Sequence, residues 1–287
     1  MTVTYPFNQL AHLKPGDHLC SLYEQEEEQA ALFTSFLRQG LNQGEKGIYI
    51  VDAHTAEEVT NHLRVNGLKA EPYLEKGQLR ILPAEATYVK DGVFDPDEMI
   101  NTLRSETINA LEEGYTALRV TGEMTWALRG LQGSERLIEY EAKLNEFFPG
   151  SKCLALCQYD RRSFKPELLL DVMVTHPIVA FGAEVYTNPY YIQPENMLGT
   201  GFHAATLQHW LKTLASQPYQ LGDIIVNKRE DSISQAGKHA ELVRGILKRH
   251  GILIRKITVV DEPEKPLAAV FEIICREVLE KNRKKAD

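Results

Sequence analysis

Short apolar runs alternate with longer amphipathic stretches along most of the chain, and this alternation restricts the fold more than any other feature. Strands that alternate with helices predict βαβ units, in which parallel strands form a sheet covered by helices. The sequence therefore predicts an α/β fold with a mainly parallel sheet flanked by helices. Strands are expected at residues 18–23, 46–51, 78–82, 116–121, 153–159 and 180–186, and helices at residues 24–43, 55–66, 96–113, 134–148 and 165–175.

The pattern of the sequence changes near residue 200, after the segment NPYYIQP, which contains two prolines. A helix is expected next, followed by strand, helix, strand and helix. With 287 residues the chain exceeds the usual size of one domain. We therefore expect a large domain at residues 1–198 and a small α/β unit of unknown role at residues 199–287. The elements expected in the second unit are at residues 203–215, 221–227, 236–250, 252–260 and 266–281.

Composition excludes several classes of protein. A net charge of −8 does not suit a protein that binds nucleic acid through a basic face. No stretch approaches the ~18–20 apolar residues that a membrane helix needs, and no secretory signal is evident at the N-terminus. The cysteines lack the spacing of a disulfide framework. We expect a protein of the reducing cytoplasm that contacts neither nucleic acid nor a membrane. Its four cysteines are Cys20, Cys153, Cys157 and Cys275.

The first predicted strand and helix are arranged as in nucleotide-binding folds, in which a phosphate loop joins the two. Such a loop needs glycines for close backbone approach, a lysine for the phosphates and a hydroxyl for magnesium. Residues 24–32 read EQEEEQAAL, with no glycine or lysine and with four glutamates that would repel a triphosphate. The sequence therefore excludes a phosphate loop here, and no cofactor is expected.

Histidine and cysteine side chains on the predicted strands are the first candidates for a binding site. His18 and Cys20 are two residues apart and point to the same face of their strand, and Cys157 lies on a later strand. Such residues can bind a metal, form a thiolate–imidazolium pair or line a pocket. Alternatively, Cys20, Cys153 and Cys157 are small core residues, as free cysteines commonly are. A histidine that opens a strand suits either the rim of a pocket or a structural role.

The sequence GEMTW, which follows the fourth predicted strand, provides a second group of candidates. In open α/β sheets ligands bind beyond the carboxyl ends of the strands, where Glu123 and Trp126 are expected. A carboxylate beside apolar side chains suits a small organic ligand, although a turn whose tryptophan covers the core explains the same residues. His176, Tyr190 and Tyr191 can either cover a pocket or fasten a crossing segment to the surface.

Five segments, in this order, resemble the MEDS family, a sensory domain named for methanogens, methylotrophs and the DcmR regulator. The resemblance covers roughly residues 10–198 and implies a RecA/KaiC-like core that has lost its phosphate loop. The segments are HLCSLYE (18–24), FLRQGLNQGEKGIYIVD (36–52), LRVTGEMTWAL (118–128), LALCQYDRRSF (154–164) and HPIVAFGAEVYTNPYYIQP (176–194).

The resemblance also implies a function, the sensing of simple hydrocarbon derivatives such as methylated or halogenated one-carbon compounds. The family's proposed ligand contacts are a histidine in the first motif and a cysteine in the later strand, which correspond to His18 and Cys157. Family members often carry a helix-turn-helix or kinase module, and neither is recognisable after residue 198. The full set of expected ligand-binding residues is His18, Cys20, Glu123, Trp126, Cys157 and Tyr159.

The sequence therefore predicts a sensory protein, not an enzyme, that binds a small organic ligand and relays to a transcription or signalling partner. No metal is expected, and a homodimer suits the family although no heptad repeat indicates one. One alternative is an enzyme with Cys157 as nucleophile, His18 as base and Glu123 as acid. Another is a metal or haem sensor built on His18, Cys20 and Cys157, and a third is a plain interaction module.

Overall fold

A seven-stranded sheet forms the centre of the computed structural model, which describes residues 10–181, 184–188, 191–194, 224–227 and 257–260. The strand order is β3-β2-β4-β5-β1-β6-β7. Strands β1 to β6 are all parallel, and only β7 runs antiparallel to its neighbour. The predicted parallel α/β sheet is thus confirmed. The strands are β1 (His18–Tyr23), β2 (Lys46–Val51), β3 (Leu79–Pro83), β4 (Leu118–Glu123), β5 (Cys153–Asp160), β6 (Ile178–Phe181) and β7 (Glu184–Thr187).

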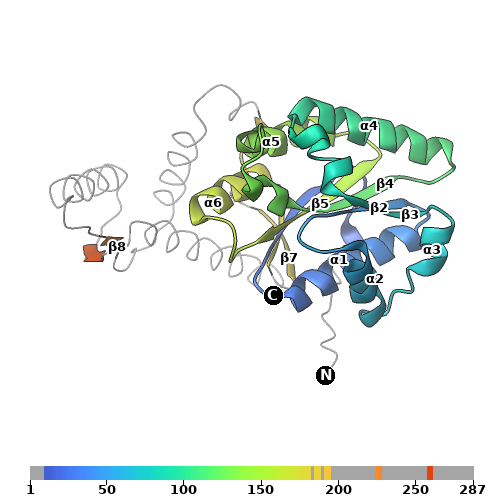
Figure 1. Cartoon of the computed structure of the whole chain (residues 1–287), viewed down its shortest axis with the longest axis horizontal. Helices are drawn as coiled ribbons and strands as arrows, with labels where there is room; N and C mark the ends of the chain where they lie inside the picture. The colour runs from blue at the N-terminus through green and yellow to red at the C-terminus, as the bar shows by residue number, and fades with distance from the viewer. Residues whose placement is uncertain (1–9, 182–183, 189–190, 195–223, 228–256, 261–287) are drawn as a thin grey trace. The chain divides into compact units, whose positions relative to one another are not determined.

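Helices cover both faces of this sheet. Helices α4 and α5 lie on one face, and α1 and α2 lie on the other (Figure 1). None of the helices in the described part of the chain is both long and apolar enough to cross a membrane. The α-helices are α1 (Glu26–Asn42), α2 (Ala56–Val65), α3 (Glu71–Glu75), α4 (Pro96–Glu112), α5 (Leu137–Phe147) and α6 (Pro166–Thr175), and short 3-10 helices lie at Leu10–His12, Ala84–Ala86, Lys90–Gly92, Met124–Arg129 and Ser134–Arg136.

Local sequence signals explain where the main helices begin. Thr55 caps α2 in a capping box, in which its side chain accepts from the Glu58 amide while the Glu58 carboxylate accepts from Thr55. The Asp95 side chain accepts from two amides at the start of α4, and Pro96 occupies the first helical position, where its missing N–H is no loss. These caps place the helices within a residue or two of the predicted bounds.

The alternating side chains of the central strands pack on both faces of the sheet. Leu19 of β1 and Leu154 and Leu156 of β5 pack with the apolar residues of α1 and α2, including Phe36. Because successive residues of a strand point to opposite faces, His18 and Cys157 face the side covered by α4 and α5. This alternation determines where the polar side chains of the sheet meet.

Three predicted elements differ from the structure. The fourth strand ends at Glu123, so this residue belongs to the strand instead of following it. The helix expected from residue 134 begins as α-helix at Leu137, because the Ser134 hydroxyl donates to the Leu131 carbonyl and does not cap the helix. The segment expected at residues 180–186 is two antiparallel strands, β6 and β7.

The second part of the chain contributes one described pair of strands. Strands β8 (Ile224–Asn227) and β9 (Ile257–Val260) are parallel, and they fall within the strands expected at residues 221–227 and 252–260. They belong to a different unit of the chain from the seven-stranded sheet. The helices expected after residue 200, and Cys275, lie outside the described residues. The domain boundary at residue 198 stays a prediction.

Candidate functional site

Four polar side chains meet in the core between the sheet and α5, and we call them the buried quartet. They come from four places in the sequence: the start of β1, the middle of α5, the middle of β5 and the turn after α6. Each is at most 3% exposed. Moving a carboxylate out of water costs several kcal/mol unless partners compensate for it, so a buried group of this kind lowers stability unless its contacts offset that cost. The quartet consists of His18, Glu141, Cys157 and His176.

The Glu141 carboxylate is the centre of the quartet. Its Oε2 atom lies 3.1 Å from Nε2 of His18 and 3.3 Å from Nε2 of His176. The Cys157 thiol lies 3.7 Å from the same oxygen and 3.6 Å from His18 Nε2. The Tyr159 hydroxyl donates to the other oxygen, Oε1. One carboxylate therefore contacts two imidazoles, a thiol and a phenol, all buried.

Secondary structure accounts for this convergence. On α5, Leu137, Tyr140 and Leu144 are buried, and Glu141 lies on the same buried face, four residues after Leu137. On the sheet, Cys157 of β5 is directly opposite Cys20 of β1 in the parallel register. The α5 face of the sheet therefore carries histidine and cysteine side chains directly beneath a helix that carries a carboxylate.

A second layer of contacts orients both histidines. Asn145, one turn after Glu141, donates its amide to the carbonyls of Glu141 and Thr175, and its Oδ1 lies 3.0 Å from Nδ1 of His18. Nδ1 of His176 lies 2.7 Å from the Val172 carbonyl. Each histidine is therefore held through Nδ1, and its Nε2 faces the quartet.

The electrostatics of the quartet favour an ionised carboxylate. Burial raises the pKa of Glu141, but the charge of His176 and the close approach of both histidines lower it well below its usual value. Burial lowers the pKa of His176, whereas Cys20 and the Glu141 carboxylate raise it well above 6.5. Burial, with the charge of His176, lowers the pKa of His18. Burial and the nearby carboxylate raise the pKa of the Cys157 thiol to about 12. The shifts of Glu141 and Cys157 favour a charged carboxylate beside a neutral thiol.

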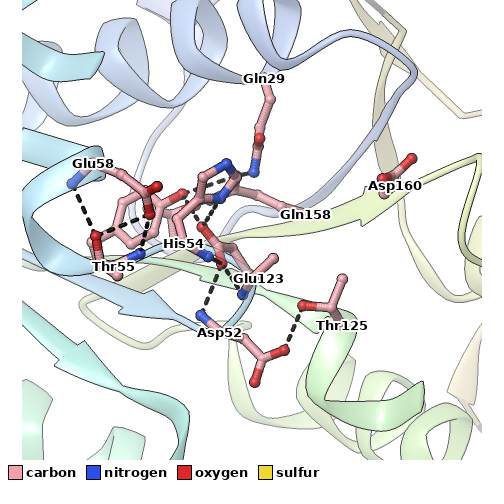
Figure 2. A network of polar contacts seen from close by, with 12 residues as sticks. Gln29, Asp52, His54, Thr55, Glu58, Glu123, Thr125, Gln158 and Asp160 are labelled. Atoms are coloured by element: carbon pink, nitrogen blue, oxygen red, sulfur yellow. Dashed lines mark hydrogen bonds and ion pairs between the residues drawn. The ribbon is translucent and has the colours of Figure 1, made fainter. Parts of the chain in front are cut away.

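A second buried carboxylate, Glu123, lies at the end of β4 and is bonded in a different way. Its Oε2 accepts from the backbone amides of Asp52, Ala53 and His54 at 2.8, 2.6 and 3.0 Å. Its Oε1 accepts from the Tyr49 hydroxyl at 2.9 Å and lies 2.9 Å from Nδ1 of His54. Figure 2 shows these contacts, which we call the strand-end network. Protein donors occupy both oxygens of this carboxylate.

The strand-end network lies on the α1 side of the sheet. Gln158, the residue after Cys157 on β5, accepts from Gln29 of α1 at 2.8 Å and from the Tyr49 hydroxyl at 3.3 Å (Figure 2). Because consecutive strand residues point to opposite faces, the network and the buried quartet are separated by the thickness of the sheet. Burial raises the pKa of Glu123, but the hydrogen bond from His54 and those from the backbone lower it overall.

Trp126 belongs to neither polar centre. Its ring stacks on Tyr88 with centroids 5.0 Å apart and lies 4.3 Å from Phe94, and both of these rings also contact Tyr140. It is fully buried. This arrangement agrees with a tryptophan that covers the core after the turn, the alternative stated from the sequence.

The structure brings some of the predicted site residues together and separates others. His18, Cys157 and Tyr159 all contact one carboxylate, and Cys20 is opposite Cys157. Glu123 and Trp126 lie elsewhere. His18 is 1% exposed, and so it is not at a pocket rim.

Glu141 is not among the residues predicted from the sequence, although the sequence carries a signal for it. In the helix expected at residues 134–148, this acidic residue occupies the apolar stripe, one turn from Leu137 and Leu144. A charged residue on the buried stripe of an amphipathic helix needs a partner in the core.

The link between β1 and α1 agrees with the absence of a phosphate loop. Tyr23 ends the strand and Glu26 begins the helix, so only residues 24 and 25 join them. The fold and the site therefore define a class: a parallel α/β sheet protein with a polar centre inside its core and no glycine-rich loop after the first strand.

Comparison with known proteins identifies the family within this class. Residues 17–177 match the family model described as MEDS, the MEthanogen/methylotroph, DcmR Sensory domain. The match covers more than half of the chain, and the protein belongs to this family of sensory domains. Every member of the buried quartet lies within the matched residues.

A curated relative is similar in sequence, and two solved structures align with part of the chain. The transcriptional repressor DcmR of Methylorubrum extorquens is 28% identical over 164 residues, which are 56% of this chain and 58% of the repressor. The KaiC-like protein PH0186 of Pyrococcus horikoshii aligns with a TM-score of 0.45 and 16% identity, over 63% of this chain and 78% of its own. The flagellar accessory protein FlaH of Methanocaldococcus jannaschii has a TM-score of 0.44 and 11% identity, over 62% and 79%.

Proposed function

We propose that this protein senses a small organic molecule, a one-carbon compound or simple hydrocarbon derivative, at the buried quartet, and relays its presence to a transcription or signalling partner. The observation that carries the proposal is the quartet itself. Four polar groups, two imidazoles, a thiol and the Tyr159 phenol, converge on one buried carboxylate. Groups with perturbed pKa values that gather in this way are typical of functional sites.

The size of the centre favours a small ligand. The ligand atoms of the quartet all lie within 4.8 Å of one another, so a ligand that enters must be a few atoms in size and must replace existing contacts. Thiol, imidazole and phenol groups offer both donors and acceptors to such a molecule. We propose that His18, Cys20, Cys157 and Tyr159 contact the ligand, while Glu123 and Trp126 support the fold around it.

A route for the signal begins at the turn that carries His176. The Asn188 amide donates to the carbonyls of Met173 and His176 at 2.5 and 2.7 Å, and the Ile192 amide donates to Val174 at 2.8 Å. A ligand that moves the His176 ring therefore acts on the segment after β7. To shift that segment, the ligand must bind one of its arrangements more tightly than the other.

The properties of the Cys157 thiol agree better with a sensory role than with a role as a nucleophile. Cys157 is 3% exposed, and burial raises its pKa to about 12, whereas covalent catalysis needs a thiolate. The name of the similar repressor supports output to transcription, although the chain spans only 58% of that protein. The buried free cysteines in the described residues suit a reducing cytoplasm, in which we place the protein.

A thermal-shift screen tests the proposal. The purified full chain is heated with methanol, methylamines, methanethiol or dichloromethane, each in excess. A ligand at ~100 times its Kd stabilises the folded state by about 2.7 kcal/mol, which raises the melting temperature by several degrees. We expect one compound to do so in the wild type and in Cys153→Ser, which alters another buried cysteine of β5, and not in Cys157→Ser. An equal shift in all three proteins, or none in the wild type, would contradict the proposal.

Hydrogen exchange tests the relay separately. With the ligand found in the screen, we expect changed exchange in residues 184–194 and changed protease sensitivity after residue 198. If hydrogen exchange and protease sensitivity are both unchanged at saturating ligand, the relay by this route is contradicted, whereas the proposed ligand site is not.

A further inference from the structure

The buried quartet has the atoms and the spacing of a metal site. Its four candidate ligand atoms, two imidazole nitrogens, one thiol sulfur and one carboxylate oxygen, all lie within 4.8 Å of one another. The pairwise distances around Glu141 are 3.1, 3.3 and 3.7 Å, and the sulfur-to-nitrogen distance is 3.6 Å. A tetrahedral zinc ion with bonds of about 2.0–2.3 Å has neighbouring ligand atoms roughly 3.3–3.7 Å apart. The side chains are therefore spaced as ligands of a single ion.

His18 presents the correct nitrogen. The Asn145 amide group donates to two backbone carbonyls, so its Oδ1 is the atom that faces His18 Nδ1. This oxygen can only accept, and the proton therefore lies on Nδ1. The lone pair of the neutral ring lies on Nε2, which faces the quartet. Metal-binding histidines almost always donate their other N–H to an oxygen in this way.

His176 is held in the same manner. Its Nδ1 is 2.7 Å from the Val172 carbonyl, which can only accept. Its Nε2 is completely buried, faces the Glu141 carboxylate at 3.3 Å and makes no hydrogen bond of good geometry. A buried nitrogen in this position is costly unless another partner fills the site. A metal ion would be bound by this nitrogen directly.

Charge and burial point to one class of ion. A carboxylate and a thiolate together balance a divalent cation, so the loaded site would be neutral, as an apolar core requires. Nitrogen, sulfur and oxygen ligands in tetrahedral array suit zinc or a similar first-row metal better than magnesium or calcium. All four side chains are almost fully buried, as in closed structural sites. We propose that His18, Glu141, Cys157 and His176 bind one divalent transition-metal ion of the zinc class.

Binding would release protons, because Cys157 must be a thiolate and both rings must offer a free Nε2 lone pair. The site would also connect β1, α5, β5 and the turn after α6, so the ion would hold together segments far apart in sequence. This proposal does not depend on the sensing of an organic compound. A protein that binds metal and no one-carbon compound would keep the site and lose the proposed function.

Cobalt(II) provides the test, since it takes the place of zinc and reports its ligands by its spectrum. The full chain is produced with cobalt, and bound metal is quantified. We expect one ion per chain, intense visible bands typical of tetrahedral cobalt, and a near-ultraviolet sulfur-to-cobalt charge-transfer band. Cys157→Ser removes that band, whereas the matched control Cys153→Ser, on the same strand and equally buried, keeps it.

A further variant keeps the test decisive if Cys157→Ser does not fold. Asn145→Ala retains all four ligands and removes the oxygen that holds His18, together with the amide donor to the Glu141 and Thr175 carbonyls. Loss of a contact that orients a metal-binding histidine typically lowers metal affinity 10- to 100-fold. We expect a fall of that size in a competition titration with a chelator. The proposal is overturned if the folded wild type takes up no cobalt, if the charge-transfer band survives Cys157→Ser, or if Asn145→Ala binds the metal as tightly as the wild type.

Discussion

Two buried glutamates on opposite faces of one sheet show how differently a protein can use the same side chain. Glu123 is bound by three backbone amides, a tyrosine and a histidine, and its acceptor capacity is used by the fold. Glu141 contacts two imidazoles and a thiol, which can themselves accept or release a proton. Backbone amides can only donate, so the first centre fixes a loop. The second centre can exchange protons, ligands or an ion, and is suited to function.

Neutralising each glutamate should give the largest difference between the two centres. In Glu123→Gln the side chain loses its charge and one of two acceptor oxygens, although donors are directed at both, and we expect a loss of about 3 kcal/mol in the free energy of unfolding. In Glu141→Gln, studied without metal, the amide can donate to a histidine Nε2 and accept from Tyr159, so we expect about 1 kcal/mol or less. Denaturant unfolding, followed by Trp126 fluorescence in a Trp210→Phe background, measures both. Equal losses would remove the distinction between the centres.

Removing one tyrosine hydroxyl from each centre should have a smaller effect, in the opposite order. Tyr159 is the donor to Oε1 of Glu141, so Tyr159→Phe leaves a buried oxygen without that partner and should cost about 2 kcal/mol. Tyr49→Phe leaves four other donors on Glu123 and should cost about 1 kcal/mol. The same unfolding assay compares them. A larger loss for Tyr49→Phe would show that Glu141 is the better-compensated carboxylate.

The smallest effect concerns pH and tests the strand-end network alone. The hydrogen bond to Glu123 raises the pKa of His54 above 6.5, while Glu123 has its pKa lowered from 4.5. A histidine whose pKa is raised by folding stabilises the folded protein at pH values below its pKa in the unfolded chain. This stabilisation is lost as the pH rises through its pKa in the folded protein. A carboxyl group whose pKa is lowered by folding stabilises the folded protein at pH values above its pKa in the unfolded chain. The pair therefore contributes most between about pH 4.5 and 6.5.

His54→Gln measures this contribution. Because the His54 side chain is partly exposed, we expect it to amount to less than about 1 kcal/mol. The difference in unfolding free energy from the wild type should be largest at mildly acidic pH and should shrink toward about pH 8. A constant difference across this range would mean that His54 contributes as a neutral group.

The sequence contained most of the fold and only part of the site. Periodicity and caps such as Thr55 and Asp95 predict the strands and helices, because those signals are local. The quartet is not local: its members lie up to 158 residues apart, at positions 18 and 176. His18 and Cys157 are candidates from their residue types on predicted strands, and the family resemblance adds to this. Glu141 is not among the candidates, because a helix pattern shows which face is buried but not what that face contacts.

His18 and Glu123, both predicted to contact the ligand, lie on opposite faces of the sheet for a simple reason. Both residues are on strands of one sheet, but the direction of each side chain depends on strand register. A one-residue difference in phase separates the two faces. Trp126 was likewise expected near a ligand at the strand ends, whereas stacking on Tyr88 and Phe94 holds it within the core.

Strand β5 carries a member of each polar group in adjacent positions, Cys157 toward α5 and Gln158 toward α1. This constrains how related sequences can differ in length. Deleting one residue earlier in β5 would turn the amide toward the carboxylate of α5 and the thiol toward α1, disabling both faces in a single event. Loops on either side can lengthen or shorten at little cost. Alignments of relatives should therefore show gaps around β5 and none within it.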